Sequence, residues 1–99
     1  MRLSSRQQEK IRQAAARILG SKATIRLFGS RTDDTLRGGD IDLLIETDKT
    51  LTNRAKTLCD LYGALIFALG DRKIDILLKD AKTPDQPIFE IARQTGIRL

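Results

Sequence analysis

The sequence contains no histidine and no tryptophan, and it has only one cysteine, two prolines, one tyrosine and three phenylalanines. Without histidine, the Ser-His and Cys-His nucleophilic mechanisms are excluded, and the usual general base is missing. The lone Cys59 can neither form a disulfide within the chain nor build a zinc site. Any chemistry must therefore use carboxylates, lysines, arginines, hydroxyl groups or a bound metal ion.

Long apolar runs are also missing. No run approaches the about 20 residues that are needed to cross a bilayer, and residues 1–5 are not typical of a signal peptide. We therefore expect a cytoplasmic protein with no membrane partner. The 99 residues, of which 40% are hydrophobic and 31% charged, are typical of an ordinary folded chain. They predict one domain over residues 1–99.

Acidic residues are fewer than basic ones, which gives a formal net charge of +5. Such a charge is one indication of a protein that binds nucleic acid. However, aromatic side chains on which bases could stack are scarce, and the basic residues are spread along the whole chain. A positive surface would equally suit a nucleoside triphosphate or an acidic protein. We therefore do not expect nucleic acid to be the main partner.

The recurrence of apolar residues predicts a series of helices and strands. Ser4 or Ser5 is typical of a helix start, and so is the segment 83–86, with Thr83 as the cap and Pro84 first inside the helix. The predicted elements are a helix to about Leu19, strands 24–28 and 41–45, a helix over 51–69, a strand 73–79 and a last helix that Gly96 ends. This order predicts an α/β fold of the α+β type, in which a small mixed three-stranded sheet is covered by helices.

The clearest helical pattern lies in segment 51–69. Cys59 and Ile66 widen a stripe of apolar residues that are spaced by three and four positions: Leu51, Ala55, Leu58, Tyr62, Leu65 and Leu69. We interpret this stripe as core rather than as a dimer seam, with Cys59 as a small buried residue. The basic positions in the N-terminal region are typical of a solvated helix face, with a partner contact as the alternative: Arg2, Arg6, Arg12 and Arg17.

Phe28-Gly29-Ser30-Arg31 stands where a predicted strand passes into a turn or a short helix. A glycine there lets the backbone approach a ligand closely, and free amide groups at a helix start attract phosphate. Ser30 adds a hydroxyl that can donate to a phosphate oxygen. The motif also fits a purely structural interpretation, in which Gly29 makes the turn and Ser30 caps a helix. By itself it leaves both interpretations open.

Acidic residues recur in the two strands that follow. Asp40 and Asp42 are two apart, so they project from the same side of a strand, roughly 6–7 Å apart at the backbone. Asp75 is flanked by apolar residues in a strand that we expect to be mostly buried, where an unpaired carboxylate is costly. If the strands are neighbours, three carboxylates could hold one or two Mg²⁺ or Mn²⁺ ions. A solvated strand end is the alternative for Asp40 and Asp42.

Together, Leu27-Phe28-Gly29-Ser30-Arg31, a short polar spacer and Gly39-Asp40-Ile41-Asp42-Leu43 resemble the minimal nucleotidyltransferases of the DNA polymerase beta superfamily. The resemblance continues through Asp75 and the segment 87–92, so it covers nearly the whole chain. The spacer departs from the usual pattern, since Asp34 replaces a glycine and Gly38 precedes Gly39 before the acidic pair. The roles of Arg31 and Arg37 depend most on this spacer.

The resemblance implies a polymerase beta-like fold and a set of site residues. It implies that Gly29, Ser30 and Arg31 bind the nucleotide phosphates. It also implies that Asp40, Asp42 and Asp75 are the catalytic residues and the ligands of two Mg²⁺ ions. Small members of this family resemble antitoxins that are paired with a helical HEPN ribonuclease toxin and transfer AMP from ATP to one of its tyrosines. The resemblance therefore implies an AMP-transferring antitoxin with such a partner.

Two other functions fit the same residues. The chain could neutralise its partner by binding alone, in which case Asp40 and Asp42 would be dispensable. It could instead direct nucleotidyl transfer to RNA, in which case binding would fall steeply with salt. Arg72 and Lys73 could reach a triphosphate, but their spacing does not require it.

Overall fold

The computed structural model describes residues 3–28, 41–70 and 73–99. The elements are α1 (Ser5–Leu19), β1 (Thr24–Phe28), β2 (Ile41–Glu46), α2 (Arg54–Leu69), β3 (Ile74–Lys79), α3 (Pro87–Thr95) and β4 (Ile97–Arg98). None of the helices in these ranges is both long and apolar enough to cross a membrane.

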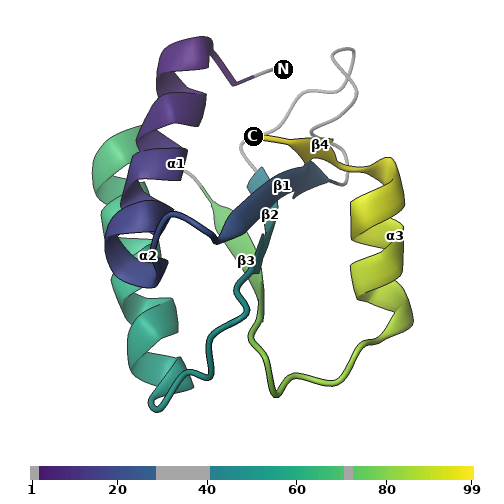
Figure 1. The fold of residues 1–99 in the computed structure, drawn as a ribbon. Helices are drawn as coiled ribbons and strands as arrows, with labels where there is room; N and C mark the ends of the chain where they lie inside the picture. Colours follow the sequence, from purple (N-terminus) through teal and green to yellow (C-terminus); the bar gives the residue numbers. More distant parts are fainter. Residues whose placement is uncertain (1–2, 29–40, 71–72) are drawn as a thin grey trace.

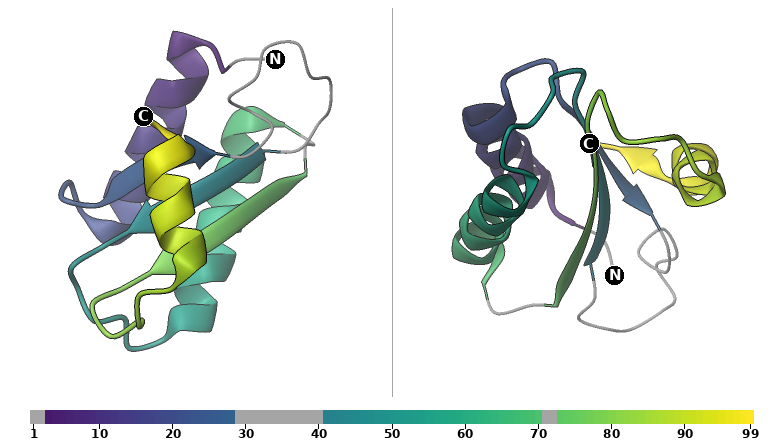
Figure 2. Two further views of the ribbon diagram at one scale, coloured as in Figure 1. Left: turned by 90° about the vertical axis from the view of Figure 1, so that its right-hand side faces the viewer. Right: turned by 90° about the horizontal axis from the view of Figure 1, so that it is seen from below.

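The strands form one four-stranded sheet in the order β3-β2-β1-β4. β1 is antiparallel to both β2 and β4, whereas β2 and β3 are parallel. Figure 1 shows α1 and α2 together on one face of the sheet and α3 on the other. Seen from below in Figure 2, the sheet is the middle of three layers. The predicted α/β fold with a mixed sheet is confirmed.

The sheet has one strand more than the sequence predicted. Ile97 and Arg98 form β4 and pair with Leu27 and Arg26 of β1. Both β4 residues are exposed, and two residues are too few to show an alternating pattern. Their pairing depends on the position of the end of α3 relative to β1. Beyond β4, the backbone N–H of Leu99 donates to the Ile25 carbonyl at 2.9 Å.

The last helix begins at Pro87 and not at Pro84. Both prolines follow a residue that can precede a helix, so local signals did not separate them. Thr83 is part of a turn instead, where its Oγ1 donates to Asp80 Oδ1 at 2.7 Å. The later start places Phe89 against Leu44 of the sheet. The predicted end is confirmed, because α3 stops at Thr95 and Gly96 is its C-cap residue.

Most of the core lies between the sheet and the pair α1 and α2. Ser4 caps α1 in a capping box with Gln7, which confirms the predicted start. The buried residues of α1 recur at helical spacing: Ile11, Ala14, Ala15 and Leu19. From the sheet, Ile41, Leu43 and Ile45 of β2 enter the same cluster, because alternate residues of a strand project to the same face.

The apolar stripe of α2 packs into the core, as predicted, but the buried residues are not all those that the spacing predicted. Asn53 caps the helix, which buries Leu61, Leu65 and Leu69. Leu61 was not in the predicted stripe, and Ala55, Cys59 and Ile66 prove to be exposed. When apolar residues cover a broad part of a helix, the sequence does not show which of them face the sheet. Consecutive residues project about 100° apart around the helix axis, so several faces are apolar enough to be buried. The prediction that Cys59 is buried was therefore wrong.

Candidate active site

Two of the predicted acidic residues lie side by side in the sheet. Asp42 on β2 is opposite Asp75 on β3, and on its other side it is opposite Phe28 of β1. Residues that are opposite one another in neighbouring strands project from the same face, and the strands are about 4.8 Å apart. The register therefore brings Asp42 and Asp75 together, as the sequence hypothesis requires, although their role as metal ligands stays a prediction.

This acidic pair lies on the α3 face of the sheet. Ile41 and Leu43, which alternate with Asp42, are buried in the core beneath α1 and α2. Leu44 points to the opposite face and is buried against Phe89 of α3. Asp42 is half-buried, and it has interactions of its own. The hydrophobic alternation of β2 thus directs Asp42 away from the main core.

Asp75 is exposed, whereas the sequence led us to expect a mostly buried strand. The reason is the place of β3 in the fold. β3 is an edge strand, and α3 packs mainly against β1 and β2. The apolar neighbours Ile74 and Ile76 point to the other face, where they contact the core. The burial argument for Asp75 was therefore wrong, and what remains is its register with Asp42.

Side chains of α2 hold β3 in this position. The Tyr62 hydroxyl accepts a hydrogen bond from the Ile76 backbone N–H at 3.1 Å. Further along, the Arg54 guanidinium donates to the Leu78 carbonyl. These contacts satisfy backbone groups on the side of β3 that faces away from β2, which would otherwise form an open sheet edge. They also fix the strand that carries Asp75.

A further carboxylate on the same face of the sheet, Glu46 of β2, is already paired with cations. Its Oε2 accepts from Arg93 Nη2 of α3 at 3.0 Å, and its Oε1 accepts from Arg26 Nη1 at 3.2 Å. The hydrogen bond with Glu46, and then that with Asp85, raises the pKa of Arg93. In turn, the hydrogen bond from Arg93 lowers the pKa of Asp85. These ion pairs tie α3 to the sheet and leave Glu46 unsuited to bind a metal ion.

Asp80, just after β3, is a buried carboxylate that the sequence reasoning missed. It accepts hydrogen bonds from the Leu51 N–H at 3.0 Å, the Lys82 N–H at 3.1 Å and Thr83 Oγ1 at 2.7 Å. The bond from Leu51, then that from Thr83, lowers its pKa to about 2. The signal was the spacing of Asp80 and Thr83, which is typical of a turn closed by side-chain bonds. With its oxygens occupied by these donors, Asp80 serves the fold and not the chemistry.

The other predicted site residues lie outside the described residues: Gly29, Ser30, Arg31, Arg37, Asp40 and Arg72. In the sequence, Gly29 directly follows β1 and Asp40 directly precedes β2. Lys73 is exposed, and its carbonyl accepts from the Ile41 N–H at 2.9 Å. Within the described ranges, no group of three or more His, Cys, Asp or Glu residues could hold a metal ion. The predicted set of three carboxylates includes Asp40, so it is not contained in those ranges.

The match to a known family covers nearly all of these elements. The family model described as a nucleotidyltransferase domain matches residues 8–94, from within α1 to within α3. The chain belongs to the nucleotidyltransferase domain family. The match includes Asp42, Asp75 and both strands that carry them. It supports the resemblance to the polymerase beta superfamily and assigns nucleotidyl transfer as the general activity. A search of the curated proteins found no significant match to the chain.

Proposed function

We propose that this nucleotidyltransferase moves AMP from Mg²⁺-bound ATP to a hydroxyl group of a partner protein. Specifically, the acceptor would be a tyrosine of a HEPN ribonuclease toxin, so that the chain acts as its antitoxin. The observation that carries the proposal is the register of Asp42 and Asp75, which places two carboxylates on one face of neighbouring strands. The family match supports the general reaction, and the resemblance in sequence supports the acceptor and the partner.

The acidic pair fits a divalent metal ion. Two carboxylates on adjacent strands repel each other, and a bound cation removes that repulsion. Carboxylate oxygens in a site with room for water are the ligands that Mg²⁺ prefers. Asp42, Asp75 and Asp40 would hold the metal, which would neutralise charge on the triphosphate and lower the pKa of the attacking hydroxyl. Glu46 would not take part, because two arginines already bind it.

The residues of the chain then have distinct parts in the transfer. The acceptor oxygen forms a bond to the α-phosphorus of ATP, the bond to the β-phosphate oxygen breaks, and pyrophosphate leaves. Asp75 is exposed on an edge strand, so the side chain of another protein can approach it from solvent. We propose that its carboxylate accepts the proton of that hydroxyl. Asp42 is half-buried between β1 and β3, where it would position the nucleotide end of the site.

The test is transfer of label from α-³²P-ATP, in the presence of Mg²⁺, to a purified HEPN protein. We expect labelled HEPN with the wild-type chain and a loss of at least about 100-fold in rate with Asp42→Ala or Asp75→Asn. Asp60→Asn is a matched control, because it removes an exposed carboxylate that is paired with Lys56 on α2. Circular dichroism would verify that each variant is folded.

The outcomes separate the proposed function from its alternatives. Equal labelling by wild type and the Asp42 and Asp75 variants would refute the role of the carboxylate pair. Inhibition of the HEPN ribonuclease by Asp42→Ala without ATP would favour an antitoxin that acts by binding alone. Label on the 3′ ends of added RNA, but not on protein, would favour RNA-directed transfer.

A further inference from the structure

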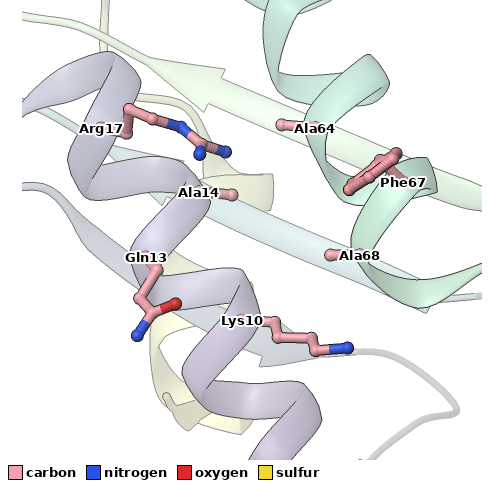
Figure 3. A pocket seen from close by; sticks show the side chains of 7 residues that line it. All are labelled: Lys10, Gln13, Ala14, Arg17, Ala64, Phe67 and Ala68. Carbon is pink, nitrogen blue, oxygen red and sulfur yellow. The ribbon is translucent and has the colours of Figure 1, made fainter.

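A small groove lies between α1 and α2, on the opposite side of the sheet from Asp42 and Asp75. Its volume is about 180 Å³. Figure 3 shows its floor of small side chains and the larger side chains around it. The residues that line it are Lys10, Gln13, Ala14, Arg17, Ala64, Phe67 and Ala68. Pockets for small ligands usually measure roughly 300–1,000 Å³, so this groove suits one side chain of a larger partner.

Phe67 is the most unusual residue of the groove. Its side chain is 93% exposed, whereas Leu61, Leu65 and Leu69 of the same helix are buried. An exposed aromatic side chain at the rim of a groove with an alanine floor is an apolar feature of the kind that marks interaction sites. Aromatic residues at such places often supply much of the binding energy in protein interfaces.

The charges of the groove are all of one sign. Lys10 and Arg17 are exposed and extend from α1 toward α2 in Figure 3. Among the described residues, neither of them forms a salt bridge, whereas Arg12 on the same helix is paired with Glu9. Gln13 lies between the two cations and offers both a donor and an acceptor. A partner that complements this groove therefore carries carboxylates on both sides of an apolar side chain.

The charge also argues against a second copy of the chain as the occupant. A symmetric interface would bring Lys10 and Arg17 of both copies together, in a protein whose net charge is already +5. Nucleic acid fits less well, because an alanine floor with a single aromatic side chain offers few stacking surfaces for successive bases. An acidic protein segment matches both the apolar and the charged parts of the groove.

We propose that the groove between α1 and α2 docks an acidic, amphipathic segment of a partner protein. A bulky apolar side chain of that segment occupies the alanine floor beside Phe67, and its carboxylates pair with Lys10 and Arg17. The proposal does not depend on the proposed transfer reaction, because the groove and the acidic pair lie on opposite faces of the sheet. A partner held there leaves the face with Asp42 and Asp75 open.

The test is a display selection of random 16-residue peptides on the immobilised full-length chain, followed by fluorescence anisotropy with the enriched peptides. We expect enrichment of peptides with Asp or Glu on both sides of Leu, Phe or Trp. Phe67→Ser and the double variant Lys10→Glu/Arg17→Glu should each weaken their binding at least about tenfold. Binding to the wild type should also weaken as salt is raised.

Matched controls change similar residues elsewhere. Ile91→Ser removes a half-exposed apolar side chain on α3, and Lys22→Glu/Lys82→Glu makes the same change of net charge outside the groove. Both should bind the peptides within about twofold of the wild type, because surface changes away from a contact have small effects. Asp42→Ala should also bind normally, which separates docking from catalysis.

Several results would overturn the proposal. Enriched peptides without acidic residues, peptides that bind Phe67→Ser as well as the wild type, or no enrichment at all would each exclude the proposed occupant. Binding of a labelled oligonucleotide that is lost in Lys10→Glu/Arg17→Glu, without peptide binding, would assign the groove to nucleic acid. A dimer in sedimentation that Phe67→Ser dissociates would assign it to a second copy.

Discussion

Replacing Phe89 by alanine tests how α3 is held on the sheet. Phe89 is 6% exposed and belongs to a small cluster with Leu44 and Ala92, separate from the main core. Truncation of a buried phenylalanine destabilises proteins by about 3–5 kcal/mol. Here Leu44 would lose its contact with the phenylalanine ring, and among the described residues Phe28 and Leu77 are the partly buried apolar neighbours of this cluster. We therefore expect a loss of about 3–4 kcal/mol in the free energy of unfolding.

Urea unfolding followed by circular dichroism measures this loss. For a chain of this size the denaturant slope is about 1 kcal/mol per M, so the midpoint should fall by about 3 M. Ile91→Ala is the control, because Ile91 lies on the same helix and is 52% exposed. It should shift the midpoint by less than about 0.5 M.

A loss below about 1 kcal/mol for Phe89→Ala would refute the reasoning. It would mean that the ion pairs of Arg93 with Glu46 and Asp85, and not apolar burial, hold α3 in place. Hydrogen exchange distinguishes the two, since loss of apolar docking should speed exchange throughout α3 before the rest of the chain opens.

Two further predictions concern contacts at β3. The pKa of Asp80 is lowered to about 2, so its contribution to stability is complete above about pH 4 and is lost as pH falls toward 2. Asp80→Asn should reduce this acid dependence in thermal melts between pH 5 and 2, and an unchanged slope would contradict the assignment. Tyr62→Phe removes the acceptor for the Ile76 N–H and should destabilise the chain by about 1 kcal/mol. Faster exchange of the Ile76 amide would identify the cause, and unchanged exchange would exclude it.

The arrangement separates two surfaces of the molecule. The acidic pair lies on the α3 face, and the groove with Phe67 lies on the outer side of α1 and α2. The alternation of β2 produces this separation, because Asp42 and Leu43 point to opposite sides of one strand. A partner bound at the groove and an acceptor that approaches Asp75 therefore need not compete for the same surface.

The sequence predicted those features that depend on local patterns. Helical spacing agrees with the buried residues of α1, and the capping signal located its start at Ser4 or Ser5, of which Ser4 is the cap. The alternation in β2 showed which of its residues enter the core and placed Asp42 on the other face. The spacing of Gly29-Ser30 and Asp40-Ile41-Asp42 indicated a nucleotidyltransferase, and the match over residues 8–94 established the nucleotidyltransferase domain family.

Other features depend on contacts between segments that are distant in the sequence, and only the tertiary structure decided them. The register of Asp42 with Asp75 requires that β2 and β3 be parallel neighbours, and the exposure of Asp75 requires that β3 be an edge strand. The pairing of β4 with β1 depends on how α3 docks. Strand pairing is encoded in the packing of the whole sheet, whereas periodicity records only which side of each segment is apolar.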